Sequence, residues 1–187
     1  MLRIAERMLS DNEGEPLKFA EVFEAAGVSR GSAYRIYNGV EDLLQDLAGE
    51  WLGNFVSYLS DIEFDEPPPD WMALSDRIVE RGTRYWTDTA ETLQVLPRIR
   101  SNMPETYGDA VKSLSECLDG MFSRYFEMPA IPGWHHKLAF YTQLGDAVYS
   151  DAMRVDGQIS DQRLVEAQAL CRTYLAFHLP SDLPLRN

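Results

Sequence analysis

One stretch of sequence decides the fold of this chain, AAGVSRGSAYRIY at residues 25–37. Gly27 can take the left-handed backbone conformation that commonly ends a helix. Val28 places an apolar residue in the turn that follows, and the hydroxyl of Ser29 can accept a backbone N–H from the first turn of the next helix. The stretch therefore predicts a helix-turn-helix, a motif whose second helix can enter the major groove of DNA.

The motif continues beyond this stretch. After the turn AGVS at residues 26–29 and the helix RGSAYRIY at 30–37 comes the sequence EDLL at 41–44. Together these parts resemble the DNA-binding segment of the TetR family of bacterial transcriptional regulators. In that family an AGVS-like turn precedes a basic residue, Gly, Ser or Thr, a Tyr and a further aromatic residue, and then an acidic residue and a leucine pair. The resemblance covers Lys18 to Leu44 and implies an all-α fold.

The composition predicts a cytoplasmic protein without a membrane span. The chain has 187 residues, of which 45% are hydrophobic, enough for one core or for a small domain beside a larger one. No apolar run reaches the ~18 residues that a membrane span needs, and charged residues interrupt the start of the chain, so no signal peptide is expected. Cys117 and Cys171 lie far apart, which favours buried thiols in a reducing cytosol over a disulfide.

The net charge is negative, which is the wrong sign for a protein that contacts the DNA backbone over a wide surface. It is −13, and residues 1–60 carry five basic side chains (Arg3, Arg7, Lys18, Arg30 and Arg35) against ten acidic ones. Contacts with phosphate must therefore be local, through a few cations on one helix and through helix N-termini. We expect a weak salt dependence of DNA binding, because its slope is about −0.9 per neutralised phosphate.

Apolar residues at helical spacing predict about nine helices and no sheet. Residues 1–45 are expected to form an N-terminal three-helix head, which we call the head, and residues 46–187 a C-terminal helical part, which we call the body. A long helix at residues 41–62 should bridge the two, before a linker that contains three consecutive prolines at 67–69. The other expected helices are 2–10, 18–26, 30–37, one that begins after Asp70, 91–100, 104–125, 134–155 and 160–177.

The predicted DNA-binding residues are Lys18, Ser29, Arg30, Gly31, Ser32, Tyr34 and Arg35. Such residues also occur on any solvated helix face, but the glycine-containing turn before them favours DNA contact. The resemblance implies that Tyr34 bonds a phosphate, and Arg35 has the chemistry to read guanine O6 and N7. Two departures from the family weaken the expected affinity: Val40 replaces a common Lys, and no basic arm precedes the first helix.

The second half of the chain is rich in large apolar and aromatic residues. Such residues most often form plain helical core, but the resemblance implies that some of them line an effector cavity between the middle helices. The predicted ligand-binding residues are Tyr85, Trp86, Met103, Tyr107, Met121, Tyr125 and Tyr141. They point to an apolar or aromatic effector. Arg81, Arg84, Arg98 and Arg100 are either surface charges or, if one turns inward, a site for an anionic ligand.

No residue pattern supports catalysis, a metal site or a cofactor. His135 and His136 are adjacent, so they point about 100° apart on a helix and cannot chelate a metal from one face. The chain has no nucleophile elbow, phosphate-binding loop, zinc-protease motif or dinucleotide fingerprint. We therefore expect a protein that is not an enzyme.

These observations predict a ligand-responsive transcriptional regulator that binds a pseudo-palindromic double-stranded operator as a homodimer, and the family resemblance implies that it is a repressor. Small residues in the last two helices permit close helix contacts, and in the family this pair forms the dimer interface; packing within one chain is the alternative. A small-molecule effector would release the operator. Two other functions stay open, a TetR-like helical dimer that acts as a ligand sensor or protein-interaction module with little DNA affinity, and a small helical enzyme.

Overall fold

The structure is a computed structural model, and it describes residues 1–11, 16–62, 64, 66–89 and 103–186. These residues form eight α-helices, with one isolated antiparallel bridge between Phe126 and Leu185. The all-α prediction is confirmed, and the predicted helix at 91–100 lies outside the described residues. The helices are α1 (Leu2–Asp11), α2 (Phe19–Ala25), α3 (Arg30–Ile36), α4 (Val40–Ser60), α5 (Trp71–Asp88), α7 (Pro104–Tyr125), α8 (Trp134–Asp156) and α9 (Asp161–Ala176).

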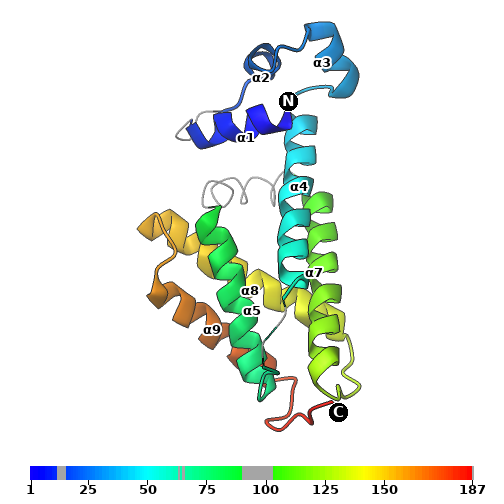
Figure 1. Cartoon of the computed structure of the whole chain (residues 1–187), viewed down its shortest axis with the longest axis vertical. Coiled ribbons are helices and arrows are strands. Elements are labelled where there is room, and N and C mark those ends of the chain that lie inside the picture. Colours follow the sequence, from blue (N-terminus) through cyan, green and yellow to red (C-terminus); the bar gives the residue numbers. More distant parts are fainter. Residues whose placement is uncertain (12–15, 63, 65, 90–102, 187) are drawn as a thin grey trace.

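The molecule is elongated, with α1, α2 and α3 at one end (Figure 1). Apolar residues spaced three and four apart place one face of α2 in the head core, where Val22 is fully buried. Ala33 of α3 and Leu43 at the start of α4 complete this core, and neither side chain is exposed. The turn is as predicted: Gly27 has a φ of +66°, and the Ser29 side chain accepts the backbone N–H of Ser32.

Helix α4 runs from the head into the body and lies beside α7 (Figure 1). It has 21 residues, which gives a rod about 30 Å long. Its first turns bury Leu43 and Leu47, and its last turns bury Phe55 and Leu59. One rigid helix therefore contributes to the packing of both ends of the molecule.

The body is built from α5, α7, α8 and α9, and its core includes Phe122 and Leu138, both fully buried. Asp70 caps α5 by accepting the backbone N–H of Ala73 at 2.7 Å, as its place after the prolines suggested. The indole N–H of Trp71 donates to the carbonyl of Pro180 at 2.8 Å, so the start of α5 is fixed to the C-terminal segment. None of the helices in the described part of the chain has the length and apolarity to cross a membrane.

Candidate functional site

The outward face of α3 carries the predicted DNA-binding side chains. Arg30, Gly31 and Arg35 are exposed, and Tyr34 keeps 48% of its surface accessible. Ala33 and Tyr37 point into the head core, as their spacing predicted. The helix therefore presents its polar residues to the outside.

A short hydrogen-bond network orders part of this face. Ser29 donates its hydroxyl to Ser32 Oγ at 3.0 Å, and Arg35 Nη2 donates to the same Ser32 oxygen at 3.1 Å. Ser29 Oγ also accepts the Ser32 backbone N–H at 3.3 Å. The guanidinium of Arg35 is thus held along the helix, close to the N-terminal turn, in the free protein.

Tyr34 is anchored from below and contacted from one side. Its ring packs edge-on against Phe19, with ring centroids 5.1 Å apart. The guanidinium carbon of Arg30 lies 5.6 Å from the Tyr34 ring centroid, within the range of a cation–π contact. The head core therefore fixes the ring while part of the side chain stays at the surface.

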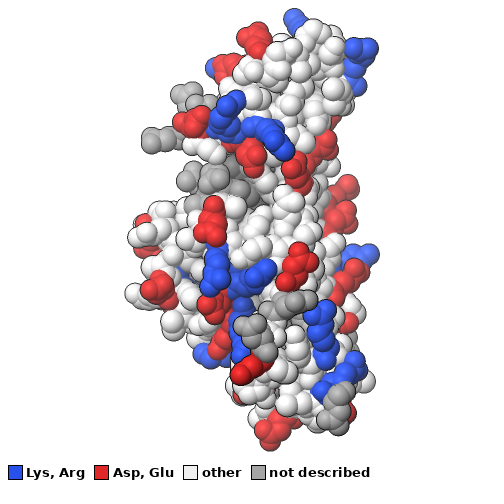
Figure 2. Space-filling model, in the orientation of Figure 1, with Lys and Arg blue, Asp and Glu red and all other residues white. Residues whose placement is uncertain are grey.

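Lys18 lies at the N-cap position of α2, one residue before the helix begins. Its ammonium group is 2.8 Å from a carboxylate oxygen of Glu21, and both side chains are exposed. Such exposed pairs contribute only about 0–1 kcal/mol to stability. Figure 2 shows acidic as well as basic side chains on the head.

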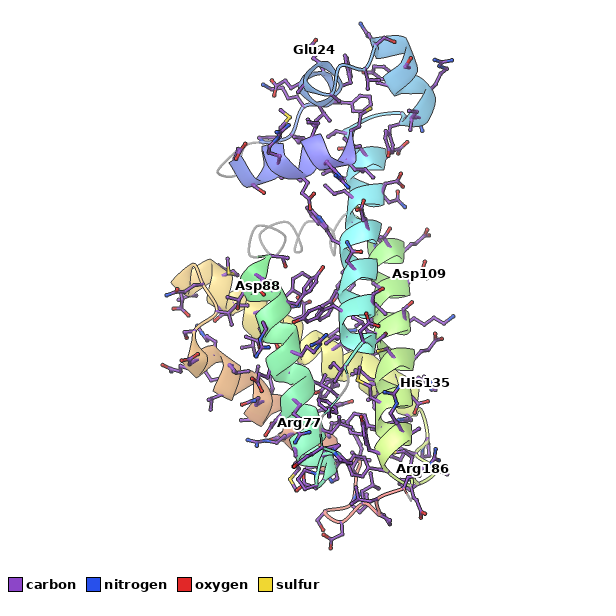
Figure 3. All side chains as sticks on the ribbon, viewed as in Figure 1. Glu24, Arg77, Asp88, Asp109, His135 and Arg186 are labelled. Carbon is purple, nitrogen blue, oxygen red and sulfur yellow. The ribbon has the colours of Figure 1, made fainter. Side chains whose placement is uncertain are left out.

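The body contains a partly open cavity of about 70 Å³ between α4, α5, α7 and α8, with Cys171 of α9 also in its wall. Its walls are mostly apolar, and Figure 3 shows side chains of α4 and α5 filling the space between the two ribbons. Phe55 of α4 and Trp86 of α5 meet there with ring centroids 4.6 Å apart. The remaining lining residues include Leu52, Leu59, Ile78, Val79, Gly82, Tyr107, Leu114, Tyr141, Gly145, Asp146, Tyr149 and Cys171.

Two buried tyrosines bring hydroxyl groups to the cavity wall. The Tyr141 hydroxyl and Ser75 Oγ are 3.0 Å apart, and the Tyr149 hydroxyl accepts from Thr83 Oγ1 at 3.0 Å. Burial raises the pKa of both tyrosines above the ordinary value, and burial raises the pKa of the nearby Cys171 thiol to about 12. These groups are therefore uncharged at neutral pH.

Asp146 is the acidic residue that lines the cavity. Tyr107 donates its hydroxyl to Asp146 Oδ2 at 2.9 Å, and Ser150 donates to Oδ1 at 3.4 Å. Among the described residues that line this cavity there is no Lys, Arg or His. The site thus combines an apolar wall with one carboxylate.

The structure brings together three of the seven predicted ligand-binding residues, Trp86, Tyr107 and Tyr141. The other four lie elsewhere: the Tyr85 hydroxyl donates to the carbonyl of Trp51, Met103 is the N-cap of α7, Met121 is core, and Tyr125 packs on Phe64. The sequence identified aromatic residues of the body, but helical spacing did not show which of them line the same cavity.

Sequence reasoning missed Tyr149 and Asp146. One signal for Tyr149 was present, because Tyr141, Gly145 and Tyr149 stand at spacings of four and lie on one face of α8. Of the arginines singled out with this region, Arg81 and Arg84 do not line the cavity. Arg81 donates to the Tyr58 carbonyl at 3.1 Å, and Arg84 is exposed on α5. Arg98 and Arg100 lie outside the described residues.

A chain of contacts joins the cavity to the head. The Tyr85 ring lies 5.1 Å from Phe55, and its hydroxyl donates to the carbonyl of Trp51 at 3.3 Å. The indole N–H of the same Trp51 donates to Glu6 Oε1 of α1 at 2.8 Å. Trp51 therefore connects α1 of the head with α5 of the body through a single residue of α4.

Exposed apolar side chains gather on α8 and α9. Among the described residues, nine large hydrophobic side chains are exposed, and five of them lie on or directly after these two helices. We call them the α8–α9 residues: Phe140, Val155, Val165, Leu170 and Phe177. Exposed apolar side chains that adjoin one another are typical of a surface that contacts another protein chain, and α8 and α9, which carry these residues, pack against each other.

Comparison with known proteins identifies the fold. No protein-family model matches the chain, and no curated protein matches its sequence. Several solved structures are similar to it over nearly the whole chain. A TetR-family transcriptional regulator from Streptomyces coelicolor has 18% identity and a TM-score of 0.73, with 95% of this chain and 96% of that chain covered.

The fatty acid degradation regulator FadR from Bacillus halodurans has 16% identity and a TM-score of 0.61, with 93% and 92% of the two chains covered. A TetR-family regulator described from Mesorhizobium loti has 13% identity and a TM-score of 0.57, with 95% and 94% covered. The chain therefore has the fold of TetR-family transcriptional regulators, as the motif at residues 25–44 predicted.

Proposed function

We propose that this chain is a ligand-responsive transcriptional regulator that binds a pseudo-palindromic DNA operator as a homodimer, and that a small molecule in the body cavity releases it. The observation that carries the proposal is the outward face of α3, where Arg30, Tyr34 and Arg35 are accessible directly after a glycine-containing turn. The similar structures support it, because they are transcriptional regulators with the same fold.

In this proposal α3 lies in the major groove of DNA. Arg35 reads a guanine through O6 and N7, which contributes about 1–3 kcal/mol of discrimination. Tyr34 and Lys18 bond phosphates, and the N-terminal turn of α3, with Ser29, Gly31 and Ser32, approaches the backbone closely. Contacts with phosphate position the head, and Arg35 supplies the sequence preference.

Dimer formation follows from the weakness of a single head. One head with few cations binds DNA weakly, whereas two heads on a rigid body bind two half-sites about 34–36 Å apart and gain affinity through their linkage. The α8–α9 residues supply an apolar surface for the second copy. When α8 and α9 pack against the same two helices of a second copy, they bury side chains that the single chain leaves exposed.

Release by an effector acts through α4. The cavity of about 70 Å³ is smaller than the ~300–1,000 Å³ of typical ligand pockets, so a ligand must move the walls apart. Leu52, Phe55 and Leu59 of α4 form part of these walls, and the same helix packs under the head. A shift from 1:99 to 99:1 between two head spacings needs about 5.5 kcal/mol of differential ligand binding.

DNA binding is tested by selection from a pool of random duplexes. The salt concentration is fixed at about 100 mM, because the affinity for DNA depends on it. We expect an enriched palindrome for the full chain, and its loss in the variant Arg35→Ala. The matched control is Arg154→Ala, which removes an exposed arginine of α8 far from the head in the sequence. No enriched sequence with an intact dimer in solution contradicts the proposal.

That negative result favours the second candidate, a ligand sensor or protein-interaction dimer with little DNA affinity. The observation behind it is the acidic head, where five basic side chains face ten acidic ones over residues 1–60. Val40 adds to it, because an apolar side chain stands where the family often has a phosphate-binding Lys. Ligand binding without operator binding distinguishes this candidate from the regulator.

A further inference from the structure

We propose that the effector site extends from the body cavity into a groove between α4 and α7, and that its ligand is a linear amphiphile. The apolar chain of this ligand fills the cavity, and its hydrogen-bonding end lies in the groove. The inference rests on the proposed function in taking the cavity as the effector site. It is carried by the residues that the two spaces share, by their volumes and by the side chains that line each of them.

The groove adjoins the cavity. Leu52 of α4 and Ala110 of α7 line both spaces, so these two residues form the partition between them. Leu52 is only 5% exposed, and rotation of its side chain to another staggered rotamer is a small motion that would join the two spaces. The other described residues of the groove are Gly49, Gly53, Val56, Thr106, Asp109 and Ser113.

The volumes of the two spaces favour a ligand that occupies both. The cavity measures about 70 Å³ and the groove about 390 Å³. The cavity alone falls below the ~300–1,000 Å³ of typical ligand pockets, and the two spaces together fall within that range. The groove is open to solvent, so a ligand confined to it would bury little apolar surface. A chain that passes the partition buries its apolar end in the cavity.

Two glycines keep the groove open. Gly49 and Gly53 are exposed and lie one turn apart on α4, and a Cβ built at either position has nothing within 4 Å. Glycine inside a helix is less favourable than alanine, and no neighbouring side chain requires its small size here. Packing within the chain therefore does not explain the two glycines, whereas a ligand in the groove does.

The side chains of the two spaces suit opposite ends of one ligand. The cavity wall is mostly apolar, and the hydroxyls of Tyr141 and Tyr149 are already hydrogen-bonded to side chains of α5. A polar group buried there would lose its hydration without a matching hydrogen bond. The groove instead presents the hydroxyls of Thr106 and Ser113, which can both donate and accept. The polar end of the ligand therefore lies in the groove.

The test uses a series of linear alcohols of increasing length: 1-butanol, 1-hexanol and 1-octanol. Dissociation constants for the full-length chain come from ligand-dependent shifts in the melting temperature. Each buried CH₂ should tighten binding about threefold to fourfold, so 1-octanol should bind about a hundredfold more tightly than 1-butanol. An affinity that stops rising beyond 1-butanol, or no detectable binding of 1-octanol, overturns the proposal.

A second probe tests the direction in which the ligand lies. In 1,8-octanediol the end of the chain that enters the cavity carries a second hydroxyl. This diol should bind at least about tenfold more weakly than 1-octanol, because that hydroxyl is buried among apolar side chains without a partner. Equal affinities of the diol and of 1-octanol would contradict the placement of an apolar end in the cavity.

A variant assigns the long-chain binding to the groove. Long side chains on a helix lie over the preceding turn, so the side chain introduced by Gly53→Leu covers Gly49 and fills the groove without entering the cavity. Gly53→Leu should weaken 1-octanol binding at least about tenfold and leave 1-butanol binding unchanged. Its melting temperature should not fall, because leucine favours a helix more than glycine does and the position is open.

Gly120→Leu is the matched control. Gly120 is an exposed glycine of α7 that lines neither space and has nothing within 4 Å of a built Cβ, so the binding of both alcohols should stay unchanged. Equal 1-octanol affinity in the two variants, or a parallel loss of 1-butanol binding in Gly53→Leu, contradicts the inference. Failure here is distinct from failure of the proposed function, because operator selection requires no ligand and these titrations require no DNA.

Discussion

The head and the body place their candidate functional residues in opposite ways. In the head these residues lie on the surface of one short helix, α3, and a compact core below holds them in place. In the body they lie inside, on walls contributed by five helices from α4 to α9, so that Leu52 and Cys171 share one cavity although they are far apart in sequence. Function and stability are therefore separable in the head and coupled in the body, and the four predictions that follow test this difference.

The largest expected effect is in the core of the body. Phe122 is fully buried and packs edge-on against Trp134. Phe122→Ala should lower the free energy of unfolding by about 3–5 kcal/mol, from lost burial and the cavity left behind. The control is Ile36→Ala on α3, where the side chain is 65% exposed, and its effect should stay within about 0.5 kcal/mol. Urea unfolding measures the free energy of unfolding of both variants. Equal losses of stability would contradict the difference between the body core and the outward face of α3.

The next effect concerns the α8–α9 residues. Val165 is 60% exposed on α9 and belongs to the proposed dimer surface. Val165→Asp should place an unpaired charge in that surface and weaken dimerisation by about 2–5 kcal/mol, which sedimentation equilibrium would record as a monomer. Ile36→Asp introduces the same charge on the exposed face of α3, and the dimer should survive it. If the Val165→Asp variant stays dimeric, the dimer interface does not include Val165.

A smaller effect is expected at the junction between the two regions. Trp51→Phe removes the N–H that donates to Glu6, at a cost of about 1–2 kcal/mol, and should increase hydrogen exchange in α1. Trp134→Phe is a matched control, because its indole N–H donates to Asp119 within the body at 3.0 Å. Trp134→Phe should lower the free energy of unfolding by a similar amount and leave hydrogen exchange in α1 unchanged. Equal exchange in both variants would show that Trp51 does not connect head and body.

The smallest effect separates stability from binding in the body. Gly82→Ala should stabilise α5 by about 0.5–1 kcal/mol through helix propensity, because the added methyl group meets Phe55 and Tyr149 only at ordinary contact distances of 3.7 Å. The same methyl group narrows the cavity, so binding of a small apolar probe such as benzene should weaken. Gly49→Ala on α4 is the control, because an added methyl group there has nothing within 4 Å, and thermal melting should show the gain in stability with unchanged binding of the same apolar probe.

The two regions also differ in what their sequence reveals. The head could be predicted because its signals are contiguous: Gly27 adopts the positive φ that the turn needs, Ser29 caps α3, and Ala33 and Tyr37 point inward. The helices of the body could be predicted from caps and prolines, such as Asp70 before α5 and Pro104 in the first turn of α7.

The cavity could be predicted only in part. Trp86, Tyr107 and Tyr141 were identified, but helical spacing assigns a residue to a face of its own helix and not to a partner helix. Tyr85 and Tyr141 look alike in sequence, yet the hydroxyl of one donates to the backbone of α4 and the ring of the other lines the cavity. Asp146 carries no local signal, because its position depends on how α7 packs on α8.

The central claim is that Arg35 on the outward face of α3 reads a base in the major groove. It is tested most directly with the selected operator, in which single guanines are replaced by 7-deazaguanine, a base that lacks the N7 acceptor. For the wild-type chain we predict a loss of affinity of about 1–3 kcal/mol at one guanine in each half-site, and for Arg35→Ala no further loss at that position. Equal losses in the two proteins at every guanine would contradict the account.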